Sequence, residues 1–183
     1  TLGSVRTSAW SLLPRAIVRM NARYPDLRIK LRVSNSDLLI QDVVAGRLDA
    51  AMVANHLDFP AALRWRSFLD EPLFVAAPPG TPQMDAVQML TRYPYVRFRA
   101  AVPLARVIDL ELARLNLSLV EVAEIDTIAS IASCVVNGLG VSVLPQVAIR
   151  DCQVPLVCAP FGSPQLHRQI GLIERTNGAR ALL

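Results

Sequence analysis

The sequence is poor in the residues that most catalytic and metal sites require. Its 183 residues include two histidines, His56 and His167, and three cysteines, Cys134, Cys152 and Cys158. A histidine-based triad would need an unrelated serine and acid to converge on one of two positions. A zinc site from Cys152, Cys158 and His167 would lack any recognised ligand spacing. Because the chain also has no nucleophile elbow and no phosphate-binding glycine loop, we expect no enzyme activity, no metal and no cofactor.

Lysine and aromatic residues are also scarce, which argues against a nucleic-acid-binding surface. Lys30 is the only lysine, and aromatic residues make up 5% of the chain, too few for a base-stacking platform. The formal net charge of +4 comes from arginines scattered between apolar residues, without a run of five or six like charges. We therefore interpret the arginine excess as compositional and do not expect this segment to bind DNA or RNA directly.

The sequence shows no sign of export or of a membrane segment. An odd number of cysteines argues against a closed disulfide framework and fits a reducing compartment, although Cys152 and Cys158 could pair in an exported protein. The opening residues, TLGSVRTSAW, lack the basic and apolar regions of a secretion leader. Residues 127–149 carry no charge, but internal glycines and Pro145 divide them into a helix and a strand rather than a membrane span. We expect a cytoplasmic protein.

Apolar periodicity predicts alternating strands and helices in the first part of the chain. We expect a strand at residues 2–5, a polar turn at 6–8 and a helix at 11–24. A strand at residues 29–33, a helix at 36–45 and a strand at 50–54 should follow. Ser36 is expected to cap the second helix, and Gly46 to end it in the left-handed conformation. This β-α-β-α-β order predicts a parallel sheet with right-handed crossovers.

The second part of the chain repeats the same order after a proline-rich break at residues 78–82. A buried strand at residues 73–77 precedes the break. After it, we expect strands at residues 95–98, 119–125 and 141–144, which alternate with helices at 102–116 and 127–137. Asp126 or Thr127 is expected to cap the second helix of this part. Residues 166–174 form a strand that returns to the first part, and the segment TNGARALL is expected to begin a last helix. We predict lobe I at residues 1–76 plus 161–183 and lobe II at residues 77–160, with a cleft between them.

Several motifs in this order resemble one known family. Leu13-Pro14, a helix ending in Tyr24-Pro25-Asp26, a basic strand and Gly46-Arg47-Leu48-Asp49 succeed one another. DEPLFVAAPPGTP at residues 70–82 and DTIASIASCVVNGLGVSVLP at residues 126–145 follow. Together they resemble, over nearly the whole chain, the effector-binding domain of LysR-type transcriptional regulators. The resemblance implies an α/β fold of two Rossmann-like lobes with a cleft, the type II periplasmic-binding-protein fold.

The resemblance also implies a role in gene regulation. A small-molecule inducer would bind in the cleft, and the change would be relayed to an N-terminal winged helix-turn-helix domain that is absent from this chain. The family's homodimer contact would use residues 11–24 and 29–33, with a tetramer as an alternative at full length. A periplasmic solute receptor of an importer, built on the same fold, is the alternative function.

The expected ligand-binding residues lie in polar turns after the strands: Arg6, Thr7, Ser8, Ser36, Arg97, Arg99 and Thr127. Hydroxyls and helix N-termini can donate hydrogen bonds to a carboxylate, and an arginine can bind one through two parallel hydrogen bonds. These residues predict a small organic acid, with an aromatic acid as one option, whereas Asp126 would instead repel an acid or select an amine. Arg47 and Asp49 are interpreted as parts of a structural turn.

Overall fold

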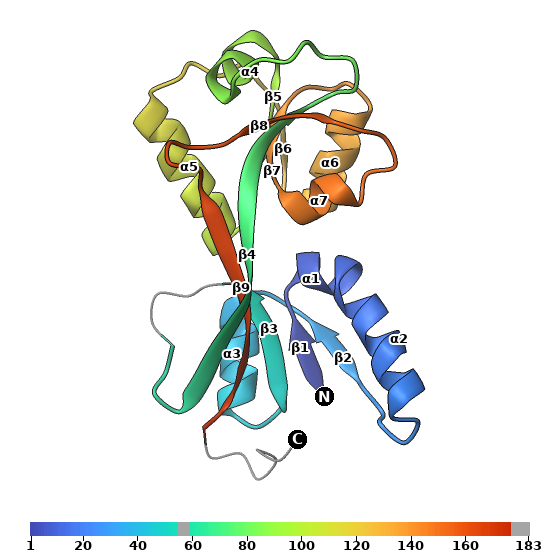
Figure 1. Ribbon diagram of the computed structural model, residues 1–183. Coiled ribbons are helices and arrows are strands. Elements are labelled where there is room, and N and C mark those ends of the chain that lie inside the picture. Colours follow the sequence, from blue (N-terminus) through green and yellow to red (C-terminus); the bar gives the residue numbers. More distant parts are fainter. Residues whose placement is uncertain (55–58, 177–183) are drawn as a thin grey trace. The chain divides into compact units, whose positions relative to one another are not determined.

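The computed structural model describes residues 1–54 and 59–176 (Figure 1). The chain divides into two compact units: Thr1–Asp70 together with the chain from Gln169 form unit 1, and Glu71–Arg168 form unit 2. Two strands pass from one unit to the other, β4 (Leu63–Ala77) and β9 (His167–Arg175). The sequence prediction places these passages after residues 76 and 160 instead. His56 and the predicted last helix lie outside the described residues.

The sheet of unit 1 is centred on β1 (Leu2–Ser4). This strand pairs in parallel with β2 (Leu31–Val33) and with β3 (Ala50–Ala54), and β9 adds to β3 in the antiparallel direction. The predicted order of strands and helices and the return of the late strand to this unit are therefore confirmed. Gly3 lies in the middle, where an added Cβ would come within 2.7–2.8 Å of three side chains, so only glycine fits there.

The helix predicted over residues 11–24 is confirmed over residues 13–23, but the polar turn predicted before it is wrong, because those residues are helical. α1 (Arg6–Ser11) occupies the residues predicted as a polar turn, and α2 (Leu13–Arg23) follows after Leu12. Pro14 explains the break, because its ring and missing N–H are poorly tolerated inside a helix but fit the first turn of a new one.

Helices cover both faces of the unit 1 sheet. α3 (Ser36–Val44) packs Val43 against Val53 in one apolar cluster, and Leu13 of α2 packs with Met52 in another. Met52 and Val53 join different clusters because neighbouring residues of a strand point to opposite faces. The interior of β3 is buried, as its uniformly apolar sequence predicts.

Charged side chains fix the C-terminal end of α3. Gly46 has a φ of +74°, as predicted for the residue that ends this helix. The buried carboxylate of Asp42 forms salt bridges with Arg47 at 2.6 Å and with Arg32 at 2.8 Å. Arg175, from β9, donates a hydrogen bond to the carbonyl of Val43 at 2.6 Å. These contacts give the Gly46-Arg47-Leu48-Asp49 turn a structural role.

Unit 2 contains two groups of strands. β5 (Tyr95–Phe98) pairs in parallel with β6 (Glu121–Ile125), and Tyr95 forms a parallel bridge with Val141. The end of β4 pairs in the antiparallel direction with β7 (Ser142–Pro145) and with β8 (Val157–Pro160). The helices of this unit are α4 (Ala86–Arg92), α5 (Pro103–Leu115), α6 (Ile128–Val136) and α7 (Gln146–Arg150). The predictions for β5, α5 and α6 are confirmed, whereas α4, α7 and the first part of β4 are not predicted.

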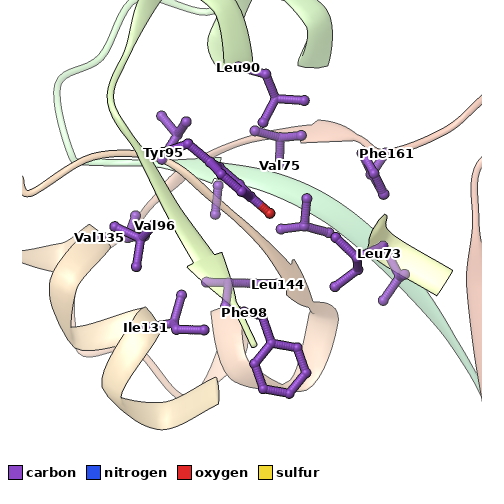
Figure 2. Packing of buried hydrophobic residues seen from close by; sticks show 14 of the residues in the cluster. Leu73, Val75, Leu90, Tyr95, Val96, Phe98, Ile131, Val135, Leu144 and Phe161 are labelled. Carbon is purple, nitrogen blue, oxygen red and sulfur yellow. The ribbon is translucent and has the colours of Figure 1, made fainter. Parts of the chain in front are cut away.

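The core of unit 2 is one large apolar cluster (Figure 2). Tyr95 lies at its centre with its side chain fully buried, and the other labelled side chains in the view are hydrocarbon. Gly140 lets the backbone approach Pro94 closely, since an added Cβ would be 2.2 Å from the Pro94 carbonyl oxygen. Residues 127–149 form α6, β7 and the start of α7, and no helix among the described residues is long and apolar enough to span a membrane.

Candidate functional site

The carboxyl ends of β1, β2 and β3 lie at one edge of the unit 1 sheet, because these strands are parallel. Thr7 and Ser8 follow β1 in the first turn of α1, and Ser36 follows β2 at the start of α3. These three side chains are at most 8% exposed, whereas Arg6, the first residue of α1, is exposed. The Ser36 hydroxyl accepts a hydrogen bond from the N–H of Ala54, at the end of β3, at 3.3 Å. Unit 1 thus collects three buried hydroxyls at the edge where parallel sheets bind ligands.

The structure corrects the predicted role of Ser36 as a helix cap. Asn35 is the capping residue: its backbone is extended, and its side chain accepts a hydrogen bond from the N–H of Leu38 at 2.9 Å. Ser36 is already helical, so its hydroxyl is directed to β3 instead. Asparagine is among the preferred capping residues, so the signal for the cap is present in the sequence, one position before Ser36.

A corresponding edge in unit 2 carries Arg99 and Thr127. Arg99 follows β5, and its backbone N–H donates a hydrogen bond at 2.9 Å to the carbonyl of Ile125, at the end of β6. Thr127 caps α6, as predicted, and its hydroxyl donates a hydrogen bond to the Ser130 hydroxyl at 2.7 Å. The Arg99 side chain is 66% exposed and forms a salt bridge with Glu124 at 2.8 Å. Arg99 therefore has an accessible guanidinium, and its backbone pairs with the end of the strand that leads into α6.

Arg97 has different surroundings, although it lies only two residues away. One Nη group donates to Asp109 of α5 and the other donates to Glu121 of β6, and the side chain is 18% exposed. Its guanidinium carbon lies 5.7 Å from the ring centroid of Tyr95. The hydrogen bond with Glu121 raises the pKa of Arg97 and lowers the pKa of Glu121. An acidic ligand would have to displace a carboxylate that Arg97 already binds.

The three cysteines are free thiols, so the Cys152–Cys158 pair is not a disulfide here. Burial raises the pKa of Cys158 to about 11 and also raises the pKa of Cys152. A raised pKa keeps a thiol protonated and slow to react. Within the described residues, no three histidine, cysteine or acidic side chains are grouped so that they could hold a metal ion.

Residues 1–182 match the sequence model of the LysR substrate binding domain. The chain belongs to this family. Its fold is accordingly the α/β type II periplasmic-binding-protein fold with two Rossmann-like lobes, as the sequence predicts. Members of the LysR family are regulators of transcription.

Curated LysR relatives and solved structures agree with this assignment. A "Probable hydrogen peroxide-inducible genes activator" of Mycobacterium leprae is 29% identical over 98% of this chain and 60% of its own length. The regulator GltR of Bacillus subtilis is 24% identical, over 82% of this chain and 50% of its own length. An OxyR cysteine mutant of Corynebacterium glutamicum has a TM-score of 0.77 at 26% identity, covering 98% of this chain and 58% of that one. The chain thus spans about half to three fifths of the length of these curated relatives.

Proposed function

We propose that this chain is the inducer-sensing domain of a cytoplasmic LysR-type transcriptional regulator. The observation that carries the proposal is the family match across residues 1–182. The effector would bind between the two lobes, and its preference for one conformation would be relayed to a winged helix-turn-helix domain outside this chain. DNA would be contacted through that domain. The alternative function, a solute receptor of an importer, is not favoured, since the curated relatives are transcriptional regulators.

We propose a small organic acid as the effector, with an aromatic acid as one option. Thr7, Ser8 and Ser36 of unit 1 supply hydroxyl groups, and Thr127 of unit 2 supplies a hydroxyl at a helix start. Among the arginines, Arg99 is the stronger candidate for the ligand carboxylate, because both Nη groups of Arg97 already bind carboxylates. Arg6 and Arg97 are secondary candidates.

A thermal-shift screen of organic acids, amines and neutral sugars tests the ligand class. We expect acids to raise the melting temperature, and stabilisation by amines or sugars alone would contradict the proposal. For an acid that binds, Arg99→Ala should weaken binding by about tenfold, the loss expected for one charge-assisted hydrogen bond. Arg92→Ala, which removes an exposed arginine at the end of α4, is the matched control and should leave the affinity unchanged.

We propose that two copies associate through residues 11–24 and 29–33. The sequence places Leu13, Ile17, Met20 and Tyr24 on one helical face, but only Leu13 of these is fully buried. Met20 is 42% exposed and Tyr24 51% exposed, and Val18 on the same helix is 69% exposed. Such a set of exposed apolar side chains on one element is typical of an association surface.

Sedimentation of the purified chain tests this surface. Val18→Asp should shift a dimer toward monomer, because it would bury an unpaired charge in the contact. Leu38→Asp, at an exposed apolar position of α3, is the control and should leave the association unchanged. If Val18→Asp associates like the parent chain, the contact lies elsewhere.

The name of the Mycobacterium leprae relative includes hydrogen peroxide. We do not propose hydrogen peroxide as the signal that this chain senses. A thiol that senses peroxide must be available as the thiolate. Burial instead raises the pKa of both Cys152 and Cys158. We therefore infer that the chain responds to a bound molecule rather than to oxidation of these two residues.

A further inference from the structure

The first half of β4 is an edge strand of unit 1. The strands of this unit follow the order β2-β1-β3-β9-β4, so residues 63–70 of β4 have β9 on one side. The other two partners of β4 are β7 and β8, which pair only with residues between Leu73 and Ala77, in unit 2. Within the described part of the chain, no strand therefore pairs with the second side of residues 63–70.

The backbone of this segment directs hydrogen-bonding groups to the open side. The carbonyl of Ala62 faces β9, because it accepts a hydrogen bond from the N–H of Thr176 at 2.9 Å. Backbone groups of successive residues in a strand point to alternate sides, so Ser67 directs its N–H and its carbonyl away from β9. No proline lies between Pro60 and Pro72, so every residue of the segment has an N–H to donate. These features allow another strand to add to the sheet.

The exposed side chains of the segment are complementary to a second copy of themselves. Four exposed side chains alternate along one face of the strand: Arg64, Arg66, Phe68 and Asp70. Two antiparallel copies centred on Ser67 would place each Arg64 opposite an Asp70, which gives two ion pairs. They would also place each Arg66 opposite a Phe68, so that a guanidinium lies beside an aromatic ring. A carboxylate accepts several donors, so Asp70 can keep a partner in its own chain as well.

Other pairings of this edge are less favourable. A centre at Arg66 would place two arginines directly opposite each other, and like charges in that position are destabilising. A centre at Phe68 would place Arg64 opposite Pro72, so this arginine would lack an acidic partner. A strand from a different protein would need its own acid and aromatic residue at matching positions. A second copy of this chain has both residues at the required spacing.

We propose that residues 63–70 of two copies pair as antiparallel strands centred on Ser67. Because β2 and β4 lie at the two ends of the strand order in unit 1, this contact uses the opposite edge from residues 29–33. Each copy contributes fewer residues than the roughly 20–30 of a standard interface, so the contact is weak on its own. It adds to assemblies in which another contact already holds copies together. The pairing goes beyond the proposed function and does not depend on it.

Disulfide formation at Ser67 tests the pairing. In the proposed register the two Ser67 residues face each other at a Cα–Cα distance of about 5.5 Å, which suits a disulfide. Ser67→Cys is placed in a chain that lacks other cysteines and carries Val18→Asp, which opposes the contact proposed for α2. Ser67 is exposed, so unit 1 should fold as before. Under mild oxidation we expect cross-linked dimers to form about tenfold faster than with Thr91→Cys, an exposed control on α4.

A charge reversal in the Ser67→Cys chain tests the register. Arg64→Glu places like charges at both contacts with Asp70 and should slow cross-linking by about tenfold. Arg28→Glu changes the charge of unit 1 equally at an exposed position outside β4 and should leave the rate unchanged. Equal effects of the two charge reversals would exclude the register centred on Ser67. Cross-linking no faster than that of Thr91→Cys would overturn the proposal and leave this edge to an extended segment of another protein.

Discussion

Removing the hydroxyl of Tyr95 should stabilise unit 2, although it removes a polar group from a natural core. The Tyr95 hydroxyl is fully buried and, among the described residues, is one of two buried side-chain atoms without a hydrogen-bond partner. Figure 2 shows its oxygen among hydrocarbon side chains, and burial raises the pKa of Tyr95. An unsatisfied buried group of this kind costs about 1–3 kcal/mol.

Tyr95→Phe keeps everything else that the side chain contributes. The ring still fills the cluster, and the guanidinium of Arg97 still lies 5.7 Å from the ring centroid. Only the desolvated oxygen is lost, and part of the gain is offset by the small void that it leaves. We therefore expect the free energy of unfolding of unit 2 to rise by about 1 kcal/mol.

Amide hydrogen exchange measures this change within unit 2. Both tryptophans, Trp10 and Trp65, lie in unit 1, so tryptophan fluorescence does not report on the core around Tyr95. The N–H of Val96, bonded to the Val141 carbonyl at 2.9 Å, is a suitable probe and should exchange about fivefold more slowly. Tyr93→Phe is the control, because Tyr93 is only half-buried and its substitution should change little. A loss of about 1 kcal/mol or more in Tyr95→Phe would refute the reasoning.

Three further predictions concern single contacts. Gly171→Ala should destabilise unit 1 by about 1–3 kcal/mol and shift the fluorescence of Trp65, since the added Cβ would be 2.5 Å from that ring. Ser67→Ala, at an exposed position, is the control, and equal unfolding of the two variants would contradict this. Cys158 should react slowly with a disulfide reagent at pH 8, because a pKa of about 11 leaves about one thiolate in a thousand; fast labelling located by mass spectrometry would exclude this. Because Arg97 lowers the pKa of Glu121, the stability from this pair should be present above the ordinary carboxyl range and be lost as the pH falls through the folded pKa. Acid unfolding of Glu121→Gln should therefore depend less steeply on pH than that of the parent chain, and an equal slope would argue against the pair.

The elements that the sequence predicts well are those whose signals are local. The uniformly apolar residues 50–54 become β3, and Gly46 and Thr127 take the helix-ending and helix-capping positions expected of them. Other local signals in the sequence mark elements that the predicted order lacks. Asp85 and Gln88 form a capping box at the start of α4, a spacing that is visible in the sequence. The alternation of Leu63 and Trp65 with arginines likewise marks the first part of β4.

The polar contacts were harder to predict, because their partners are far apart in the chain. Glu71 and Arg168 are separated by 97 positions, so no local spacing pairs them. The same holds for Arg97, which periodicity places in a strand without indicating that Asp109 and Glu121 would bind both of its Nη groups. Arg97 and Arg99 look equivalent in the sequence, and only the tertiary contacts separate the tightly paired arginine from the exposed one.

This difference between Arg97 and Arg99 bears on how the proposed site would select its ligand. Thr7, Ser8 and Ser36 of unit 1 are buried, whereas the Arg99 side chain is exposed and forms a salt bridge with Glu124. An acid that binds Arg99 would compete with one surface salt bridge, which is worth about 1 kcal/mol or less. An acid that binds Arg97 would compete with the carboxylates of Asp109 and Glu121. Because the Arg97 side chain is largely buried, displacing them costs considerably more. If the effector is an acid, as we propose, the cost of displacing existing partners favours Arg99 over Arg97 as the arginine that would bind it.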